Sequence, residues 1–78
     1  MEFKQRKTDG VYDRTWLEKA RKMQGLKQYE VAEKAQISAP FYQRIEMGLQ
    51  LPNVKMGIRI TNALGLSPQM WVEEQRIA

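Results

Sequence analysis

One stretch decides the fold: QYEVAEKAQISAPFYQRIEM, residues 28–47. Its first part carries apolar residues at the spacing of one helix face, which predicts a helix over residues 28–35. Ser38 is a good N-cap and Pro40 suits a first helical turn, so a second helix is expected from there to Met47. Two short helices joined by about three residues are typical of a helix-turn-helix.

Upstream of this stretch, the sequence predicts one more helix and a basic arm. Thr15 and Glu18 have the spacing of a capping box, and Gly25 is a suitable residue to end the helix that begins there. Residues 1–14 contain four bases and little apolar content, so we expect a mobile arm followed by a domain over residues 15–78. A turn dipeptide inside the arm leaves a short hairpin open as the alternative.

Downstream, two further helices are expected. Asn53 can cap a helix over residues 54–64, and Ser67 with Pro68 opens a short fifth helix. The buried side of the helix over residues 54–64 is expected to consist of Val54, Ile58, Thr61 and Ala63 or Leu64, with Met56 and Ile60 left open. Residues 15–78 are therefore predicted to form a single all-α domain with five helices.

The composition excludes several classes of function. A chain of 78 residues allows only one small domain. The absence of cysteine and histidine excludes disulfides, zinc fingers, thiolate nucleophiles and histidine-based triads. The two serines, Ser38 and Ser67, fit helix caps, and no glycine-rich phosphate loop is present. Neither an enzyme nor a cofactor or metal site is therefore expected.

No segment of the sequence has the pattern of a membrane span or of a secretory signal. The longest stretch without a charge covers 13 residues, 60–72, whereas a span needs about 20 apolar residues. The N-terminal residues lack the apolar region of a signal peptide. We therefore expect a cytoplasmic protein.

The charge balance favours a polyanionic partner. Lys and Arg number 13 against 9 Asp and Glu, which gives a net charge of +4 and a pI near 9.6. A basic small domain of this kind most often binds nucleic acid. Many small domains carry as much charge for solubility alone, so the composition leaves both interpretations open and the site must decide between them.

The second helix of the deciding stretch has two distinct sides. At about 100° per residue, Tyr42 and Ile45 define an inward side with Glu46 beside them. The opposite side carries Pro40, Gln43, Arg44 and Met47. Arg44 is the only base among them and can make a bidentate bond to guanine, unless it is a solvated residue or belongs to a surface ion pair.

The other side chains of this surface suit different partners. Gln43 can bond to adenine or to a phosphate. Ala39, Pro40 and Phe41 offer no side-chain hydrogen bonds, but they can contact thymine methyl groups. An exposed Phe41 would also suit a protein partner.

The ordered set of residues between positions 17 and 71 resembles the phage-repressor/Cro-type helix-turn-helix domains, also called the XRE-like family. The residues that carry the resemblance are Arg21, Gly25-Leu26, Gln28, Val31-Ala32, Ile37-Ser38, Ile45-Glu46, Gly48, Pro52 and Ala63-Leu64-Gly65-Leu66-Ser67. The resemblance implies a lambda-repressor-like fold of five helices, in which the second and third form the helix-turn-helix.

The resemblance also implies roles for single residues at the DNA. Gln28 matches a family glutamine that begins the second helix and binds a DNA phosphate. Ser38 matches a position that begins the third helix and often touches the DNA backbone. The positions that face base edges in the major groove are matched by Ala39, Pro40 and Arg44.

Four further positions complete the expected site. Arg21 and Glu46 match a pair that forms a largely enclosed salt bridge between the first and third helices, which is a structural role. Lys27 stands where relatives have a Ser, Thr or Asn N-cap; it gives up a capping bond of about 1 kcal/mol but adds positive charge beside Gln28. Lys55, like Lys27 and Gln43, is a candidate for a phosphate contact.

These features predict a sequence-specific transcriptional regulator that binds double-stranded DNA, a small repressor. One unit reads only a few base pairs, so we expect a homodimer on a two-fold operator with half-sites about one helical turn apart. The fifth helix and the tail are the expected dimer surface, through Met70, Val72 and Ile77.

The alternative function is that of an antitoxin. Residues 66–71 are similar to a segment of the host-inhibition-type antitoxins, which bind a ribonuclease toxin and repress their own operon. A protein partner, either a toxin or an antirepressor, therefore stays open.

Overall fold

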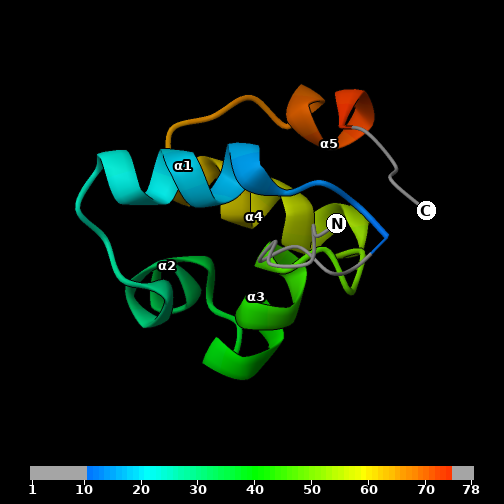
Figure 1. The fold of residues 1–78 in the computed structure, drawn as a ribbon. Helices are drawn as coiled ribbons and strands as arrows, with labels where there is room; N and C mark the ends of the chain where they lie inside the picture. Colours follow the sequence, from blue (N-terminus) through cyan, green and yellow to red (C-terminus); the bar gives the residue numbers. More distant parts are fainter. Residues whose placement is uncertain (1–10, 75–78) are drawn as a thin grey trace, which may run out of the picture.

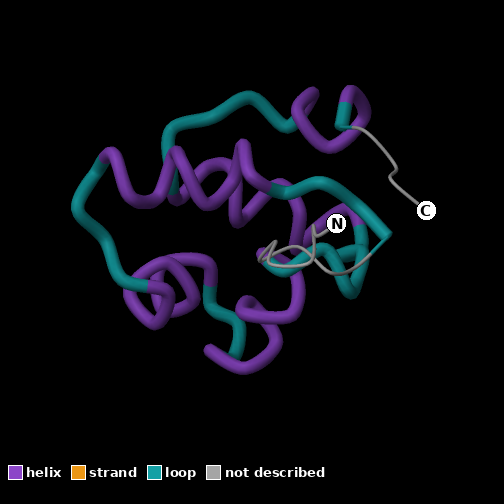
Figure 2. The backbone as a smooth tube through the Cα atoms, viewed as in Figure 1, coloured by secondary structure: helices purple, strands orange, loops and turns teal. Residues whose placement is uncertain are grey.

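The structure, a computed structural model, describes residues 11–74 and contains five helices (Figure 1). They are α1 (Thr15–Met23), α2 (Gln28–Ala35), α3 (Ala39–Glu46), α4 (Val54–Ala63) and α5 (Gln69–Glu73). Figure 2 shows helices and loops over this range, without a strand. The predicted all-α architecture is confirmed, and α2 and α3 begin and end within one residue of the predicted positions.

The core lies where α1, α2, α3 and α4 meet. α2 packs against both α3 and α4, and α1 contacts α3. The buried apolar side chains are Leu17, Val31, Ala32, Ala35, Tyr42, Ile45, Ile60 and Leu64. Covering a large apolar side chain stabilises a fold by about 1.5–3 kcal/mol, so this cluster fixes the angle between α2 and α3. α5 lies at the edge of the core, where Trp71 packs edge-on against Trp16 with ring centroids 4.9 Å apart.

Two of the predicted side-chain caps are present. The hydroxyl of Ser38 accepts a hydrogen bond from the Phe41 N–H at 3.3 Å, at the start of α3. The side chain of Asn53 accepts one from the Met56 N–H at 2.8 Å, at the start of α4. Each cap satisfies an N–H group that has no partner within its own helix, which is why the two helices begin at these positions.

The turn after α3 requires glycine. Gly48 has a φ of +81°, and a Cβ at this position would lie 2.1 Å from the main-chain oxygen of Tyr12. The close approach lets the Val11 N–H donate to the Gly48 carbonyl at 3.0 Å. The segment before α1 is thereby held against the end of α3.

The predicted capping box at the start of α1 is wrong. α1 begins at Thr15 as expected, but Thr15 donates both its N–H and its hydroxyl to the carboxylate of Asp13, at 3.0 and 2.8 Å. Asp13 precedes the helix and carries the capping oxygen. Thr15 is therefore the first helical residue and not the N-cap.

The prediction for the buried side of α4 is also wrong in part. Val54 is 79% exposed and Ile58 is 40% exposed, whereas Ile60 is fully buried. The helix carries two apolar stripes that share Thr61, and packing against α2 selects the one that continues through Ile60 to Leu64. The other stripe faces outward.

Arg14, which the sequence analysis assigned to the arm, is part of the folded domain. Its side chain has no exposed area. It forms a bidentate ion pair with Glu74 and donates to the Ile45 carbonyl at 2.6 Å and to the Gln50 carbonyl at 3.2 Å. The planar guanidinium with five donors satisfies all of these acceptors, so the charge is tolerated in the interior. Residues 1–10 of the predicted arm and hairpin lie outside the described residues.

Candidate nucleic-acid interface

The two sides of α3 are arranged as the sequence predicts. Tyr42, Ile45 and Glu46 are buried against α1 and α2. Pro40, Gln43 and Arg44 are exposed, and Met47 is half-buried at the end of the helix. The exposed side has a single cation, and it offers the mixture of apolar and hydrogen-bonding groups that base edges in a major groove require.

Arg44 is the charged side chain of this surface, and it has two contacts. Its Nε–H donates to the side-chain oxygen of Gln50 at 3.2 Å. Its guanidinium carbon lies 5.9 Å from the centre of the Phe41 ring, one helical turn earlier. Among residues 11–74, no acceptor engages the two terminal nitrogens of Arg44. The end of the guanidinium fork is therefore available to a ligand.

Phe41 does not have the fully exposed ring that would suit a protein partner. It is only partly exposed and packs against the core cluster. A ring near the start of a helix can lie along the surface and cover apolar atoms at its edge. Phe41 therefore contributes to the packing of α3 against the core.

Glu46 is the centre of a buried polar network. Arg21 donates to its two oxygens through Nε at 2.7 Å and through a terminal nitrogen at 3.1 Å. Tyr42 donates its hydroxyl at 2.9 Å, and Gln28 donates its side-chain amide at 2.7 Å. The remaining terminal nitrogen of Arg21 donates to the Leu26 carbonyl at 2.8 Å. This network joins α1, α2 and α3.

The network determines the charge state of its members. The hydrogen bond to Glu46 raises the pKa of Arg21, against the opposing effect of burial. Burial raises the pKa of the Tyr42 phenol far above its usual range, and the negative charge of Glu46 adds to the rise. Tyr42 therefore stays neutral and remains a donor at any pH at which the protein would be used.

Apart from Gln43, the phosphate-contact candidates lie at the starts of helices. Lys27 is exposed before α2, where its main-chain N–H donates to the Glu30 carboxylate at 2.7 Å. Glu30 thus supplies a capping bond at the helix start, although the Lys27 side chain makes none. Ser38 is exposed, and Lys55 is exposed in the first turn of α4.

Gln28 is placed less favourably for a phosphate than the resemblance implies. It is half-buried and directs its amide NH₂ to Glu46. In this arrangement, its main-chain N–H in the first turn of α2 and the second N–H of its side-chain amide remain as donors for a phosphate.

The described structure also contains features that sequence reasoning missed. Gln50 and its bond to Arg44 had no local signal, because the loop after α3 shows no periodicity. Glu74 was not singled out either, although its carboxylate is almost fully buried between Arg14 and the Trp16 indole N–H, which donates to it at 3.0 Å. The pairing of Glu74 with Arg14 could not be predicted, because the two residues lie 60 positions apart in the sequence and meet only in the folded chain.

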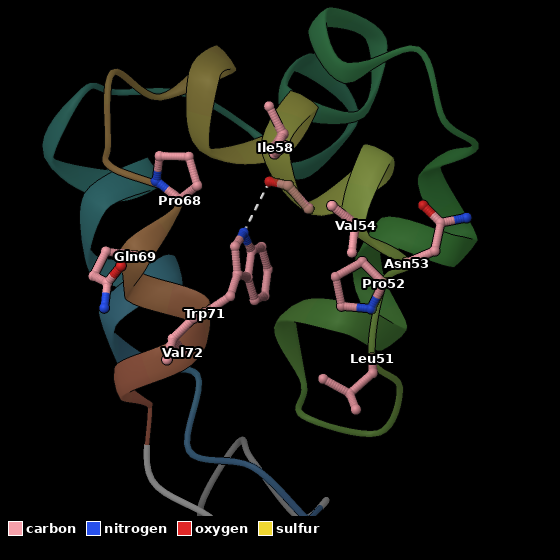
Figure 3. Close-up of a pocket in the computed structure, with 10 residues that line it drawn as sticks. Leu51, Pro52, Asn53, Val54, Ile58, Pro68, Gln69, Trp71 and Val72 are labelled. Atoms are coloured by element: carbon pink, nitrogen blue, oxygen red, sulfur yellow. Dashed lines mark hydrogen bonds between the residues drawn. The ribbon is translucent and has the colours of Figure 1, made fainter.

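An apolar hollow of about 310 Å³ lies between α4, α5 and the loop before α4 (Figure 3). The indole of Trp71 lies in its middle and donates to the Gly57 carbonyl at 2.8 Å. Its walls contain no charged residue and consist of Leu51, Pro52, Asn53, Val54, Gly57, Ile58, Pro68, Gln69, Trp71 and Val72. In the same region Met70 is half-buried and Val72 is 75% exposed, whereas Ile77 lies outside the described residues.

No helix within residues 11–74 is long and apolar enough to cross a membrane. Over the same range, no cluster of three or more acidic side chains is placed to hold a metal ion.

Comparison with known proteins relates the chain to one family. A family model described as Helix-turn-helix matches residues 17–71, more than half of the chain. The chain is 38% identical over 61 residues to the uncharacterized HTH-type transcriptional regulator YqaF of Bacillus subtilis (strain 168), a match that covers 78% of this chain and 80% of that protein. No solved structure gives a significant match. With α2 and α3 as its helix-turn-helix and with the lambda-repressor-like order of five helices, the chain belongs to the XRE-type helix-turn-helix family.

Proposed function

We propose that this protein is a sequence-specific DNA-binding transcriptional regulator, a small repressor that reads the major groove with α3. The observation that carries the proposal is the outward side of α3, where Arg44 is the single cation and its terminal nitrogens make no hydrogen bond within residues 11–74. The family, the name of the Bacillus subtilis relative and the net charge of +4 support a DNA-binding regulator and not an enzyme.

The roles of these residues, of which Ala39 and Gln28 are partly buried, follow from their chemistry. Arg44 bonds to the O6 and N7 atoms of a guanine, and Gln43 bonds to an adenine or a phosphate. Ala39 and Pro40 contact thymine methyl groups. Phosphates are bound by Lys27, by Gln28 through its main chain, by Ser38 and by Lys55, and such contacts make up half or more of a DNA interface.

Arg44→Ala is expected to weaken binding to the best site by about 1–3 kcal/mol and to relax the preference at one base pair per half-site. Lys55→Ala is the matched variant for a phosphate contact. It should weaken binding to all sequences alike and make the salt dependence shallower by about 0.9 in the slope of log affinity against log salt. Both are measured by titration of duplexes selected from a random library, at several salt concentrations.

Comparison of Arg44→Ala with Lys55→Ala distinguishes a residue that reads a base from one that binds a phosphate. If Arg44→Ala weakens all duplexes equally and leaves the selected motif unchanged, Arg44 is a phosphate contact and specificity comes from Gln43, the apolar edge or DNA shape. If the unmodified protein binds no selected duplex at low salt, the proposed function itself is wrong.

We further propose that the protein acts as a homodimer through the hollow between α4 and α5. The hollow and the exposed Val54 and Val72 lie in one patch without charge, so two copies can place a projecting side chain of one in the hollow of the other. One helix-turn-helix reads only a few base pairs, so a second copy provides the specificity that a regulator needs.

Val72→Lys is expected to weaken dimerisation by about tenfold or more, because a charge replaces an apolar contact in the interface. The added charge is positive, so the variant does not repel DNA. Met23→Lys is the control: Met23 is 77% exposed, much as Val72 is, but lies at the end of α1, outside the hollow. Sedimentation equilibrium gives the dimer affinity, and equal effects of the two variants would exclude this interface.

The antitoxin alternative makes use of the same surface. A toxin that binds residues 66–71 would contact Pro68, Gln69 and Trp71 at the hollow, and it would compete with the second copy. A gene for a small basic ribonuclease beside the gene for this chain would support this alternative over the simple repressor.

A further inference from the structure

Gln50 makes two contacts of different kinds after α3. Its side-chain oxygen accepts the Nε–H of Arg44 at 3.2 Å. Its main-chain oxygen accepts from a terminal nitrogen of Arg14 at 3.2 Å. The side chain of Gln50 thus contacts the exposed side of α3, while its main chain contacts the buried Arg14.

The hydrogen bond between the Arg44 Nε–H and the Gln50 side chain leaves the opposite edge of the guanidinium, with its two terminal nitrogens, free within residues 11–74. The group carries five N–H donors in one plane. With Nε–H bonded to Gln50, the two terminal nitrogens remain as a fork that can meet a pair of acceptors side by side. Guanine presents such a pair, O6 and N7, in the major groove. The guanidinium carbon lies over the Phe41 ring, 5.9 Å from its centre, within reach of a cation–π contact.

The second contact holds Gln50 in a constant position relative to α3. Arg14 donates through the same terminal nitrogen to the carbonyl of Ile45, the residue after Arg44, at 2.6 Å. Arg14 itself is fully buried and is fixed by its ion pair with Glu74. One buried guanidinium therefore connects the helix that projects Arg44 with the loop residue that orients it.

We propose that Gln50 is a positioning residue for base reading: it holds Arg44 in the orientation that matches a guanine before DNA arrives. The inference rests on the proposed function. A long arginine side chain loses much rotamer freedom when it is immobilised, and a partner that orders it in the free protein removes part of that loss from binding. The gain in binding free energy is greatest for a duplex that places a guanine opposite the terminal nitrogens of Arg44. Gln50 therefore increases specificity without touching the DNA.

Gln50→Met tests the proposal, because methionine has a similar length and no side-chain oxygen. The duplex selected by the unmodified protein is titrated with each variant, together with versions changed at the base pair that Arg44→Ala affects. Gln50→Met is expected to reduce the preference at that base pair by about 3- to 10-fold, the effect of one lost hydrogen bond. Affinity for a scrambled duplex should not change. In an Arg44→Ala background, Gln50→Met should have no further effect.

Two control variants accompany it. Gln50→Glu keeps an acceptor at the same distance, so it should retain the preference at this base pair even if its negative charge weakens binding to all duplexes. Leu49→Ala changes the neighbouring exposed residue of the same loop and should leave the preference unchanged. A uniform loss with Gln50→Met on all duplexes, or no loss at all, overturns the proposal.

A measurement without DNA keeps this inference separate from the proposed function. The ¹⁵N relaxation of the Arg44 Nε–H group reports the order of the guanidinium in the free protein. The order parameter should be high in the unmodified protein and in Leu49→Ala, and it should fall in Gln50→Met. Equal order parameters in all three proteins would show that Gln50 does not orient Arg44, whether or not the protein binds DNA.

Discussion

Glu46→Ala is expected to lower the free energy of unfolding by about 3–5 kcal/mol, as the removal of one partner from a buried ion pair does. The variant leaves the largely buried Arg21 guanidinium without its counter-charge, and Tyr42 and Gln28 lose the acceptor of their hydrogen bonds. A small domain has a total stability of about 5–15 kcal/mol, so this loss takes a large part of it. Urea unfolding followed by circular dichroism measures the difference.

The matched control is Glu33→Ala, which removes an exposed carboxylate from α2. It should change the stability by no more than about 0.5 kcal/mol. A double variant that replaces Arg21 and Glu46 by apolar residues of similar volume should recover most of the loss, because no unpaired charge is left inside. If Glu46→Ala destabilises no more than Glu33→Ala, the pair is not part of the architecture.

Arg14→Leu is expected to have an effect of similar size, about 3–5 kcal/mol. The side chain of Glu74 is only 2% exposed and would keep the Trp16 N–H as a donor without a positive charge beside it. The carbonyls of Ile45 and Gln50 would lose a donor at the same time. Because Glu74 directly follows α5, we also expect α5 to detach first, which quenching of Trp71 fluorescence can follow during urea unfolding.

Two control variants test whether the loss of stability in Arg14→Leu comes from its buried ion pair and hydrogen bonds. Lys19→Leu removes an exposed positive charge from α1 and should be close to neutral. Arg14→Lys keeps the charge but lacks the planar fork, so it should fall between Arg14→Leu and the unmodified protein. A near-neutral Arg14→Leu would mean that residues 11–14 do not belong to the folded domain and that the arm extends to the start of α1.

The helix-turn-helix could be predicted from the sequence because its signals act over a few residues. Ser38 caps α3, which begins at the next residue. The buried and exposed sides of α3 follow from the positions of Tyr42 and Ile45 within the same helix. The pairing of Arg21 with Glu46 is different: the resemblance suggested it, and the contact itself spans 25 positions.

The face of α4 could not be predicted because two stripes satisfy the same helical period. Val54 and Ile58 are as apolar as Ile60 and Leu64, and periodicity alone does not distinguish between the stripes. The position of α2 distinguishes between them, because only the stripe with Ile60 and Leu64 packs against it. Val54 and Ile58 therefore remain on the outer side of α4, where they line the hollow of the proposed dimer surface.

The sequence by itself determined the helices, their ends and the outward side of α3, because caps, glycine turns and helical periodicity are local effects. Only the tertiary structure decided that Arg14 is buried, that Glu74 pairs with it and that Gln50 accepts a hydrogen bond from Arg44. An arginine is usually exposed, and nothing within a few residues of Arg14 indicates otherwise. Its environment consists of acceptors and rings from segments far apart in the chain, and these meet only when the core has formed.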